Sequence, residues 1–202
     1  MSGRGSESTE ILITRASDGD DEAIGVLLER HLPALRAYLR LRMGPHIRRW
    51  ETESDVAQSV CLEILKSLQD FAYRGESAFR HWLFTAAQHK LVERDRYYRA
   101  QKRDPARLQT GPPATASTDD PVVREMCRAV GTPSEHAVGR ETLERIEAAL
   151  DCLPEDGREV ILLSRLAGLS NAEIAEAMGK SESAVTTMLC RSLAELARML
   201  AD

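Results

Sequence analysis

The sequence predicts an all-α protein made of two small helical bundles that are joined by a flexible, proline-rich linker. Apolar residues recur at helical spacing both before and after this linker. Aromatic residues make up only 4% of the sequence, which disfavours β-rich classes. Five of the eight prolines fall within residues 104–140, where no long helix is expected because proline fixes φ and lacks an amide donor. We therefore expect domains at 18–103 and 141–202, with the linker at 104–140 between them.

The first bundle begins with two or more helices. Asp18–Asp21 supplies capping side chains for a helix that starts near Glu22. Pro33 is expected in the first turn of the next helix, or at a bend between the two, and Gly44–Pro45 ends a segment.

Two further helical segments complete the first bundle. A helix is expected from Asp55 to near residue 70, because an apolar stripe recurs every four residues at Val56, Val60, Ile64 and Leu68. Asp55, Gln58 and Ser59 lie off the centre line of that stripe. Residues 78–104 contain no helix breaker and form either one long helix or two helices joined by a kink.

The second bundle shows four helical patterns. Pro154 opens its second helix, which Gly168 ends. Ser170–Glu173 has the spacing of a capping box, in which the serine and glutamate side chains each satisfy a free backbone amide. A short helix ends at Gly179, and Ser181 can cap the next one. This order of helix, glycine-containing turn and helix is the helix-turn-helix pattern.

The last helix has two different faces. An apolar stripe must pack inward, and its members are Val185, Leu189, Leu193, Leu196 and Leu200. The opposite side is polar and carries Ser183, Thr186, Thr187, Cys190 and Arg191. Small hydroxylated side chains and one arginine near a helix N-terminus suit a probe of the DNA major groove. A plain helical bundle with a polar outer face is the alternative interpretation.

The charge is unevenly placed along the chain. Residues 31–107 hold 15 lysines and arginines against 9 aspartates and glutamates, a net charge of +6, although the whole chain has −5. A basic block inside an acidic chain indicates one segment that faces phosphates. Ordinary solvated helix surface is the other explanation.

Several function classes find no support in the sequence. The five histidines form no HxxxH pair and the four cysteines no CxxC pair, so neither a metal site nor a cofactor is expected. No nucleophile–base pair can be proposed, so the chain is not expected to be an enzyme. No signal peptide and no apolar stretch long enough for membrane insertion is visible, and a cytoplasmic protein is expected.

Three segments together resemble the extracytoplasmic-function (ECF) group of bacterial RNA polymerase sigma factors. They are ESDVAQSVCLEILKSLQDF, FRHWLFTAAQHKLVERDRYYRAQKR and LPEDGREVILLSRLAGLSNAEIAEAMGKSESAVTTMLCRSLAEL. The resemblance implies sigma domain two in the first bundle and sigma domain four in the second. It also implies binding to the clamp of core RNA polymerase, recognition and melting of the −10 promoter element, and recognition of the −35 element.

The resemblance assigns roles to the residues that match the family's motifs. Asp55 and Gln58 match its clamp-docking acid and amide, whereas Ser59 stands where the family usually has an acid. The −10 region is implied to use Arg80, His89, Lys90, Arg94, Arg96, Tyr97, Arg99, Lys102 and Arg103. His89 replaces the usual Asn, which leaves the −10 base preference open.

The −35 contact is implied to use Ser183, Thr186, Thr187 and Arg191. The family often has Lys or Arg where this chain has Thr186 and Thr187, so the −35 affinity stays open. An anti-sigma protein is a further partner that the resemblance allows. The rival hypothesis is a helix-turn-helix regulator that binds DNA without joining polymerase, and a helical protein-binding adaptor is a third.

Overall fold

A computed structural model describes residues 8–67, 76–101 and 140–201. These residues form helices and contain no strand, in agreement with the all-α prediction. Residues 104–139 of the predicted linker lie outside them. The helices are α1 (Thr9–Ser17), α2 (Asp21–Arg42), α3 (Pro45–Arg48), α4 (Glu53–Ser67), α5 (Glu76–Gln101), α7 (Arg140–Cys152), α8 (Glu155–Arg165), α9 (Asn171–Met178) and α10 (Glu182–Ala201).

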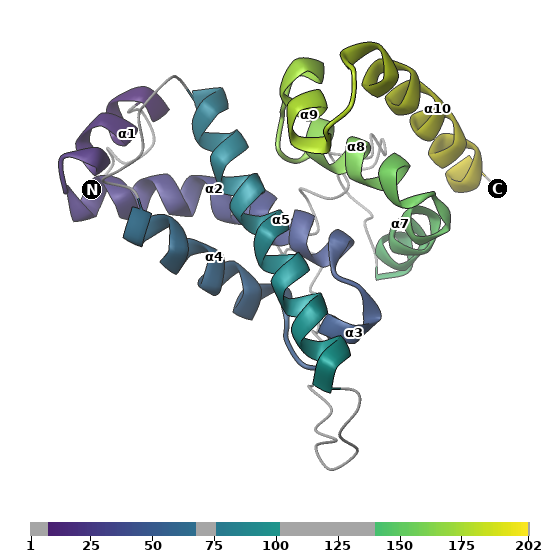
Figure 1. The fold of residues 1–202 in the computed structure, drawn as a ribbon, viewed down its shortest axis with the longest axis horizontal. Coiled ribbons are helices and arrows are strands. Elements are labelled where there is room, and N and C mark those ends of the chain that lie inside the picture. Colours follow the sequence, from purple (N-terminus) through teal and green to yellow (C-terminus); the bar gives the residue numbers. More distant parts are fainter. Residues whose placement is uncertain (1–7, 68–75, 102–139, 202) are drawn as a thin grey trace.

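The N-terminal bundle begins one helix earlier than the sequence analysis expected. The Ser8 side chain caps α1 by accepting a hydrogen bond from the amide of Ile11. Leu12 and Ile13 are buried where α1 packs on α2, because the two helices run side by side (Figure 1). The helix therefore adds apolar area to the bundle, although it lies outside the predicted range 18–103.

Helix α2 is continuous through Pro33, which corrects the expectation of a helix start or a bend between two helices there. Its N-terminus agrees with the prediction, since the Asp20 carboxylate accepts from the amides of Glu22 and Ala23. A proline inside a helix costs about 3 kcal/mol. Leu27 and Leu35, which lie before and after the proline, are buried. Each buried side chain contributes roughly 1.5–3 kcal/mol, which offsets the cost of the proline.

Helices α4 and α5 complete the N-terminal core. Val56, Val60 and Ile64 of α4 are buried, as the stripe predicted. Helix α5 is one unbroken helix, which decides between the two arrangements that the sequence left open. Phe84 of α5 meets Tyr38 of α2 edge to face, with ring centroids 5.2 Å apart, so aromatic packing joins the two longest helices of the bundle.

The C-terminal bundle forms as predicted from its local signals. The Ser170 hydroxyl accepts from the Glu173 amide, and the Glu173 carboxylate accepts from the Ser170 amide, so the capping box is present. Gly179 ends α9 with φ +62°, a left-handed conformation that glycine adopts without a Cβ clash. Ser181 caps α10 by accepting from the Ala184 amide at 3.3 Å. Helices α9 and α10 thus form the predicted helix-turn-helix.

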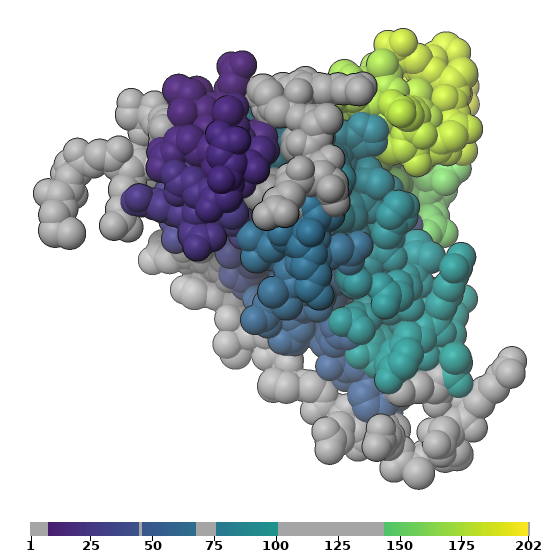
Figure 2. Space-filling view, turned by 60° about the vertical axis from the view of Figure 1, so that its left-hand side comes forward, coloured from purple at the N-terminus to yellow at the C-terminus, as the bar shows by residue number. Residues whose placement is uncertain are grey.

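The two bundles pack against each other. Helices α7 to α10 lie beside α5 and the C-terminal end of α2, on the side of the molecule away from α1 (Figures 1 and 2). Tyr38 is fully buried in the N-terminal bundle, and its hydroxyl donates to Glu159 of α8 at 2.8 Å. Within the described ranges, each helix is too short or too polar to cross a membrane.

Candidate functional site

The outer face of α10 is the first candidate surface. Val185 and Leu196 are buried, and the helix turns its opposite side outward. All four residues predicted for the −35 contact are exposed on it, namely Ser183, Thr186, Thr187 and Arg191. The N-terminal half of α10 therefore presents a polar surface made of hydroxyls and one guanidinium.

Hydrogen bonds within the chain determine whether the hydroxyls of this surface can donate or accept. The Thr186 and Thr187 hydroxyls donate to the carbonyls of Glu182 and Ser183, each at 2.9 Å. Because their protons point into the helix, the hydroxyl oxygens face outward as acceptors. Asn171 of α9 donates to the Thr186 hydroxyl at 3.0 Å and joins the two helices of the motif. The sequence analysis did not assign a role to Asn171, although this residue directly follows the Ser170 cap at the start of α9.

Asp55 on α4 has a structural role that the sequence analysis did not assign. Its carboxylate accepts from the Thr52 amide and the Thr52 hydroxyl, both at 2.8 Å, while the Asp55 amide donates to that hydroxyl at 3.2 Å. The hydrogen bond from the Thr52 amide, followed by that from its side chain, lowers the pKa of Asp55. The spacing Thr-x-x-Asp is the signal that could have predicted this cap. Asp55 is nevertheless exposed and carries its charge outward.

The other two predicted polymerase-binding residues differ in burial. Gln58 is exposed, one turn along α4 from Asp55. Ser59 is half-buried; its hydroxyl donates to the Asp55 carbonyl at 3.1 Å and accepts from Arg94 of α5 at 3.3 Å. Ser59 therefore helps to join α4 to α5.

Several basic residues of α5 are paired with acids of the N-terminal bundle. Lys90 lies 2.8 Å from both Glu63 and Glu93, and these hydrogen bonds raise the pKa of its ammonium. Arg99 pairs with Asp95 at 2.7 Å. Because most of the acids in these pairs lie near solvent, each pair contributes little to stability.

A second α5 cluster surrounds Glu51. Arg94 pairs with Glu51 at 3.2 Å, and the Tyr98 hydroxyl donates to the same carboxylate. The Tyr98 ring stacks on Trp50, with centroids 6.0 Å apart and planes 5° from parallel. Burial, followed by the Glu51 carboxylate, raises the pKa of Tyr98, so the hydroxyl keeps its proton. This cluster fixes Arg94 and Tyr98, whereas Tyr97 is 51% exposed.

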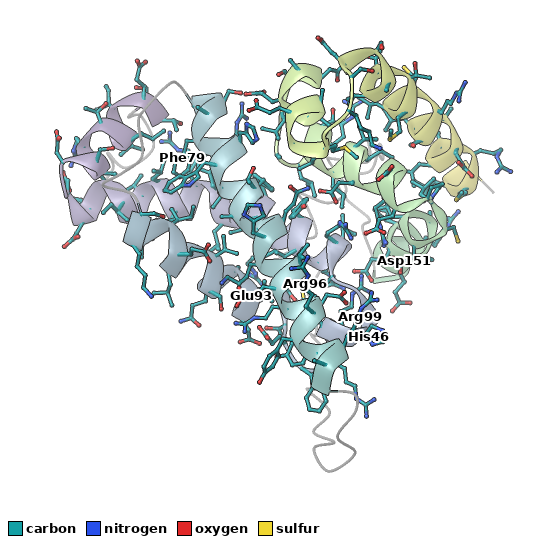
Figure 3. All side chains as sticks on the ribbon, in the orientation of Figure 1. His46, Phe79, Glu93, Arg96, Arg99 and Asp151 are labelled. Atoms are coloured by element: carbon teal, nitrogen blue, oxygen red, sulfur yellow. The ribbon has the colours of Figure 1, made fainter. Side chains whose placement is uncertain are left out.

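The remaining residues predicted for the −10 region fall into three groups. His89 and Arg96 are exposed, and Arg96 and Arg99 project from the same end of α5, beside α3 (Figure 3). The Arg80 side chain instead faces the C-terminal bundle and packs against Gly168. A Cβ atom placed on that glycine would lie only 2.8 Å from a guanidinium nitrogen of Arg80. Lys102 and Arg103 lie outside the described residues.

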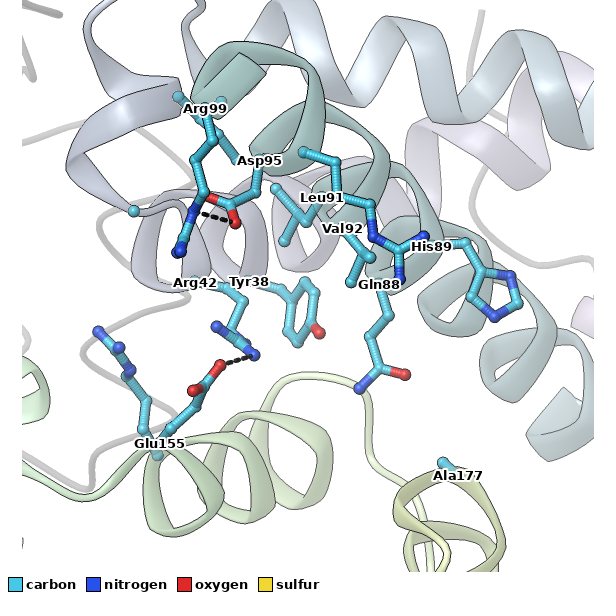
Figure 4. Close-up of a pocket in the computed structure, with 14 residues that line it drawn as sticks. Tyr38, Arg42, Gln88, His89, Leu91, Val92, Asp95, Arg99, Glu155 and Ala177 are labelled. Carbon is cyan, nitrogen blue, oxygen red and sulfur yellow. Dashed lines mark hydrogen bonds and ion pairs between the residues drawn. The ribbon is translucent and has the colours of Figure 1, made fainter. Parts of the chain in front are cut away.

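A cleft separates α5 from the C-terminal bundle. It has a volume of about 580 Å³ and is lined by His89, Arg96 and Arg99 on one side and by Glu155 and Arg158 of α8 on the other (Figure 4). Arg42 of α2 reaches into it and pairs with Glu155 at 2.8 Å. No group of three or more metal-ligating side chains occurs in the described part of the chain.

Comparison with known proteins decides the family. A sequence model of the family described as Sigma-70, region 4 matches residues 143–196, which run from α7 into α10. The ECF RNA polymerase sigma factor ShbA of Streptomyces griseus subsp. griseus is 31% identical over 203 residues, and the alignment covers 98% of this chain and 99% of that protein. The chain belongs to the ECF RNA polymerase sigma factors. The ECF sigma factor SigD of Mycobacterium tuberculosis is also similar, with 30% identity over 190 residues that cover 94% of this chain and 82% of SigD.

Solved structures show the same fold as this sigma factor. CnrH, solved in complex with the cytosolic domain of CnrY, aligns with a TM-score of 0.59 and 24% identity, over 96% of this chain and 98% of that one. RpoE of Bartonella quintana, solved in complex with the anti-sigma factor NepR, aligns with a TM-score of 0.62 and 19% identity. That alignment covers 92% of this chain and 98% of RpoE. The resemblance stated from the sequence is confirmed, and the function is that of a sigma factor in transcription initiation. The rival regulator that never joins polymerase is not favoured.

Proposed function

We propose that this sigma factor docks on the polymerase clamp through the exposed side of α4 and reads a promoter with α5 and α10. The observation that carries the promoter half is the outer face of α10. Ser183, Thr187 and Arg191 are exposed there, at the N-terminal half of the second helix of a helix-turn-helix. That half of the helix is the part that enters the major groove in such motifs. Arg191 would anchor on a guanine or a phosphate, and Thr187 would offer its oxygen to a base donor.

Helix α5 would act on the −10 element. Its Arg96, Arg99 and Lys90 would neutralise phosphates, and Tyr97, half-exposed beside them, would stack on an unpaired base. Three acids pair with Lys90 and Arg99 in the free chain. Promoter binding on this surface would therefore exchange carboxylates for phosphates rather than fill an empty site.

Polymerase docking would use Asp55 and Gln58. Both are exposed on α4, and the capping bonds to Thr52 keep the Asp55 carboxylate ionised and fixed in direction. A fixed carboxylate suits a basic partner because less side-chain freedom is lost on binding.

Two further properties belong to this proposal. The chain would supply no catalytic group, since RNA polymerase performs the chemistry, and it would act in the cytoplasm. The two solved relatives are held by CnrY and by the anti-sigma factor NepR. By analogy, an anti-sigma protein would hold this chain inactive.

The test compares Arg191 with a matched arginine on the same helix. Arg198 is exposed and lies seven residues further along α10, so it projects from nearly the same face but about 10 Å nearer the C-terminus. We expect Arg191→Ala to weaken the binding of reconstituted holoenzyme to a promoter roughly tenfold, which corresponds to about 1.4 kcal/mol. Arg198→Ala should leave this binding unchanged.

The measurement is holoenzyme binding to promoters mutated separately at the −35 and −10 elements, across a salt series. A base contact by Arg191 changes the discrimination among −35 sequences, whereas a phosphate contact weakens them all and reduces the salt slope by about one. If Arg191→Ala and Thr187→Ala bind every upstream sequence as the wild type does, α10 is not the −35 reader.

A further inference from the structure

Thr186 lies where the two helices of the helix-turn-helix meet. It is exposed near the N-terminus of α10, and the Asn171 side chain reaches it from the first residue of α9. A threonine carries no charge with which to attract a phosphate. The hydrogen bonds that Thr186 already makes therefore decide what it can recognise in DNA.

The two side-chain hydrogen bonds of Thr186 leave its hydroxyl as an acceptor. The one hydroxyl proton goes to the Glu182 carbonyl at 2.9 Å. The Asn171 amide nitrogen donates to the same hydroxyl oxygen at 3.0 Å and takes one of its two lone pairs. One lone pair remains for a ligand. It is a strengthened acceptor, because hydrogen bonds in a chain polarise one another.

Asn171 is placed to hold Thr186 in this state. It is half-buried, and it follows directly on the capping box of Ser170 and Glu173, which fixes the first turn of α9. Its N–H occupies a second direction around the Thr186 oxygen. The Thr186 side chain therefore loses two hydrogen bonds if it changes rotamer.

Thr187 provides a comparison within the same helix. Its hydroxyl donates to the Ser183 carbonyl at 2.9 Å, so it also faces outward as an acceptor. In the described part of the chain, no side chain of α9 donates to it. Thr187 therefore loses only one hydrogen bond if it changes rotamer. The second helix of the motif fixes Thr186 and leaves Thr187 freer.

The charges near Thr186 have the same polarity as its hydroxyl. Glu182 lies one turn earlier on α10 and is exposed, and a carboxylate only accepts hydrogen bonds. Residues 182–190 contain no lysine or arginine. Arg191 follows Thr186 by five residues, which places it about 140° further around the helix. The edge of α10 at Glu182 and Thr186 therefore offers acceptors to DNA.

Bases differ in what they present to such an edge. In the major groove, adenine and cytosine expose an amino group, which donates, whereas guanine and thymine expose only acceptors. An acceptor on the protein matches the first two bases. Facing guanine or thymine, Thr186 either opposes one acceptor to another or gives up its bond to the Glu182 carbonyl.

We propose that Asn171 is a positioning residue for promoter recognition: it holds Thr186 as an acceptor, so that α10 selects adenine or cytosine at the base pair that Thr186 faces. This proposal rests on the proposed role of α10 in reading the −35 element. The loss of one hydrogen bond at a mismatched base should weaken binding roughly tenfold.

The test measures base preference with holoenzyme reconstituted from the full-length chain and purified core polymerase. The holoenzyme selects from a promoter library randomised across the −35 element, and sequencing of the bound DNA gives the preference at each position. Thr186→Val removes the hydroxyl at nearly unchanged shape, and Thr186→Arg replaces the acceptor with a group that only donates. Thr14→Val on α1 is the matched control, because the exposed Thr14 hydroxyl also donates to the carbonyl four residues earlier.

The wild type is expected to prefer adenine or cytosine roughly tenfold over guanine and thymine at one −35 position. Thr186→Val should lose that preference, Thr186→Arg should reverse it in favour of guanine, and Thr14→Val should keep it. Replacing an adenine there with purine, which lacks the amino group, should weaken the wild type roughly tenfold and Thr186→Val not at all.

Asn171→Ala separates positioning from a general structural role. It should reduce the preference at the Thr186 position, leave the preferences due to Thr187 and Arg191 unchanged, and have no further effect when combined with Thr186→Val. A residue that only stabilised the bundle would lower the melting temperature and weaken every −35 preference together. That result, or an equal effect of Asn171→Ala with and without Thr186→Val, would overturn the role of Asn171.

Two results would overturn the acceptor role of Thr186. One is a wild-type preference for guanine or thymine at the position that Thr186→Val alters. The other is a purine substitution that weakens the wild type and Thr186→Val equally. Failure of the proposed function gives a different result: Thr186→Val, Thr187→Ala and Arg191→Ala would then all keep the wild-type preference at every −35 position, which would overturn both proposals.

Discussion

His31 is an ionisable side chain inside the N-terminal core. It is 7% exposed, and its ring centroid lies 5.3 Å from that of Phe79. Burial lowers its pKa from 6.5 to about 4, because the opposing effect of Glu76 is smaller than the cost of placing a charge there. Its Nε2 atom is buried without a hydrogen-bond partner among the described residues. The folded protein therefore holds this histidine neutral at pH 7.

We expect the neutral state of His31 to make stability fall with acidification. Since the unfolded chain takes up the proton near pH 6.5 and the folded chain only near pH 4, unfolding gains a proton between those values. The free energy of unfolding should fall by about 2 kcal/mol between pH 7 and pH 5 through this residue. Urea unfolding at both pH values measures it.

The variant His31→Gln removes this titration. It should show a pH dependence of the free energy of unfolding that is weaker by that amount. An equal pH dependence of the wild type and His31→Gln would show that His31 is not held neutral.

The surroundings of single residues were predicted unevenly. The outward face of α10 could be predicted because one helical period places Thr187 and Arg191 opposite Val185. The partners of Lys90 and Arg94 could not, since Glu63 and Glu51 lie on other segments and no local pattern pairs them. For the same reason His31 gave no signal in the sequence, where a histidine in an amphipathic helix looks the same whether exposed or buried.

At the scale of the element, α4 combines a capping role and a proposed binding role in one side chain. Asp55 holds the first turn of the helix through Thr52, and its charge also faces solvent. A substitution of Asp55 therefore tests two properties at once. A substitution of Thr52 separates the two properties, because the Thr52 hydroxyl takes part in the cap but Thr52 does not belong to the proposed docking pair of Asp55 and Gln58.

We expect Thr52→Ala and Asp55→Ala to destabilise the protein by a similar amount, about 1 kcal/mol, since each removes two of the three capping hydrogen bonds. Only Asp55→Ala should also weaken binding to purified core polymerase, by roughly tenfold if the carboxylate meets a basic partner. Thermal unfolding and a polymerase-binding assay on both variants measure the two effects. Equal polymerase affinity of the two variants would assign Asp55 to helix capping alone.

At the scale of the whole molecule, one buried glutamate and one exposed glutamate share the same arginine. Arg42 pairs with Glu159 and with Glu155, whose side chains are 6% and 72% exposed. A buried charge that loses its partner costs about 3–5 kcal/mol, and a surface pair contributes about 0–1 kcal/mol. The contact between the bundles should therefore depend on Glu159 and hardly at all on Glu155.

We expect Glu159→Ala to lower the free energy of unfolding by about 3 kcal/mol and Glu155→Ala by less than about 1 kcal/mol. Combined with Glu159→Ala, Tyr38→Phe should cost less than it does alone, since the two residues share one hydrogen bond. Urea unfolding followed by circular dichroism gives all four values. Additive costs of Tyr38→Phe and Glu159→Ala would mean that the two bundles do not couple through this pair.

The sequence by itself determined the local structure of this sigma factor. Apolar spacing, the Ser170–Glu173 capping box and Gly179 act over a few residues, so they specified the helices and the helix-turn-helix without further information. The family motifs added the function. The same local signals did not predict continuity of α2 through Pro33, because burial on both sides of the proline decides it.

Only the tertiary structure decided how the charges are used. Glu159 looks in the sequence like any acid on an amphipathic helix, yet it receives hydrogen bonds from residues 121, 117 and 71 positions away. Contacts over such separations depend on how two bundles dock as bodies, and no periodicity or spacing within either bundle encodes that choice. The sequence showed a basic segment and an acidic segment, and the fold brought them into contact because desolvated carboxylates need donors that lie close to them in space.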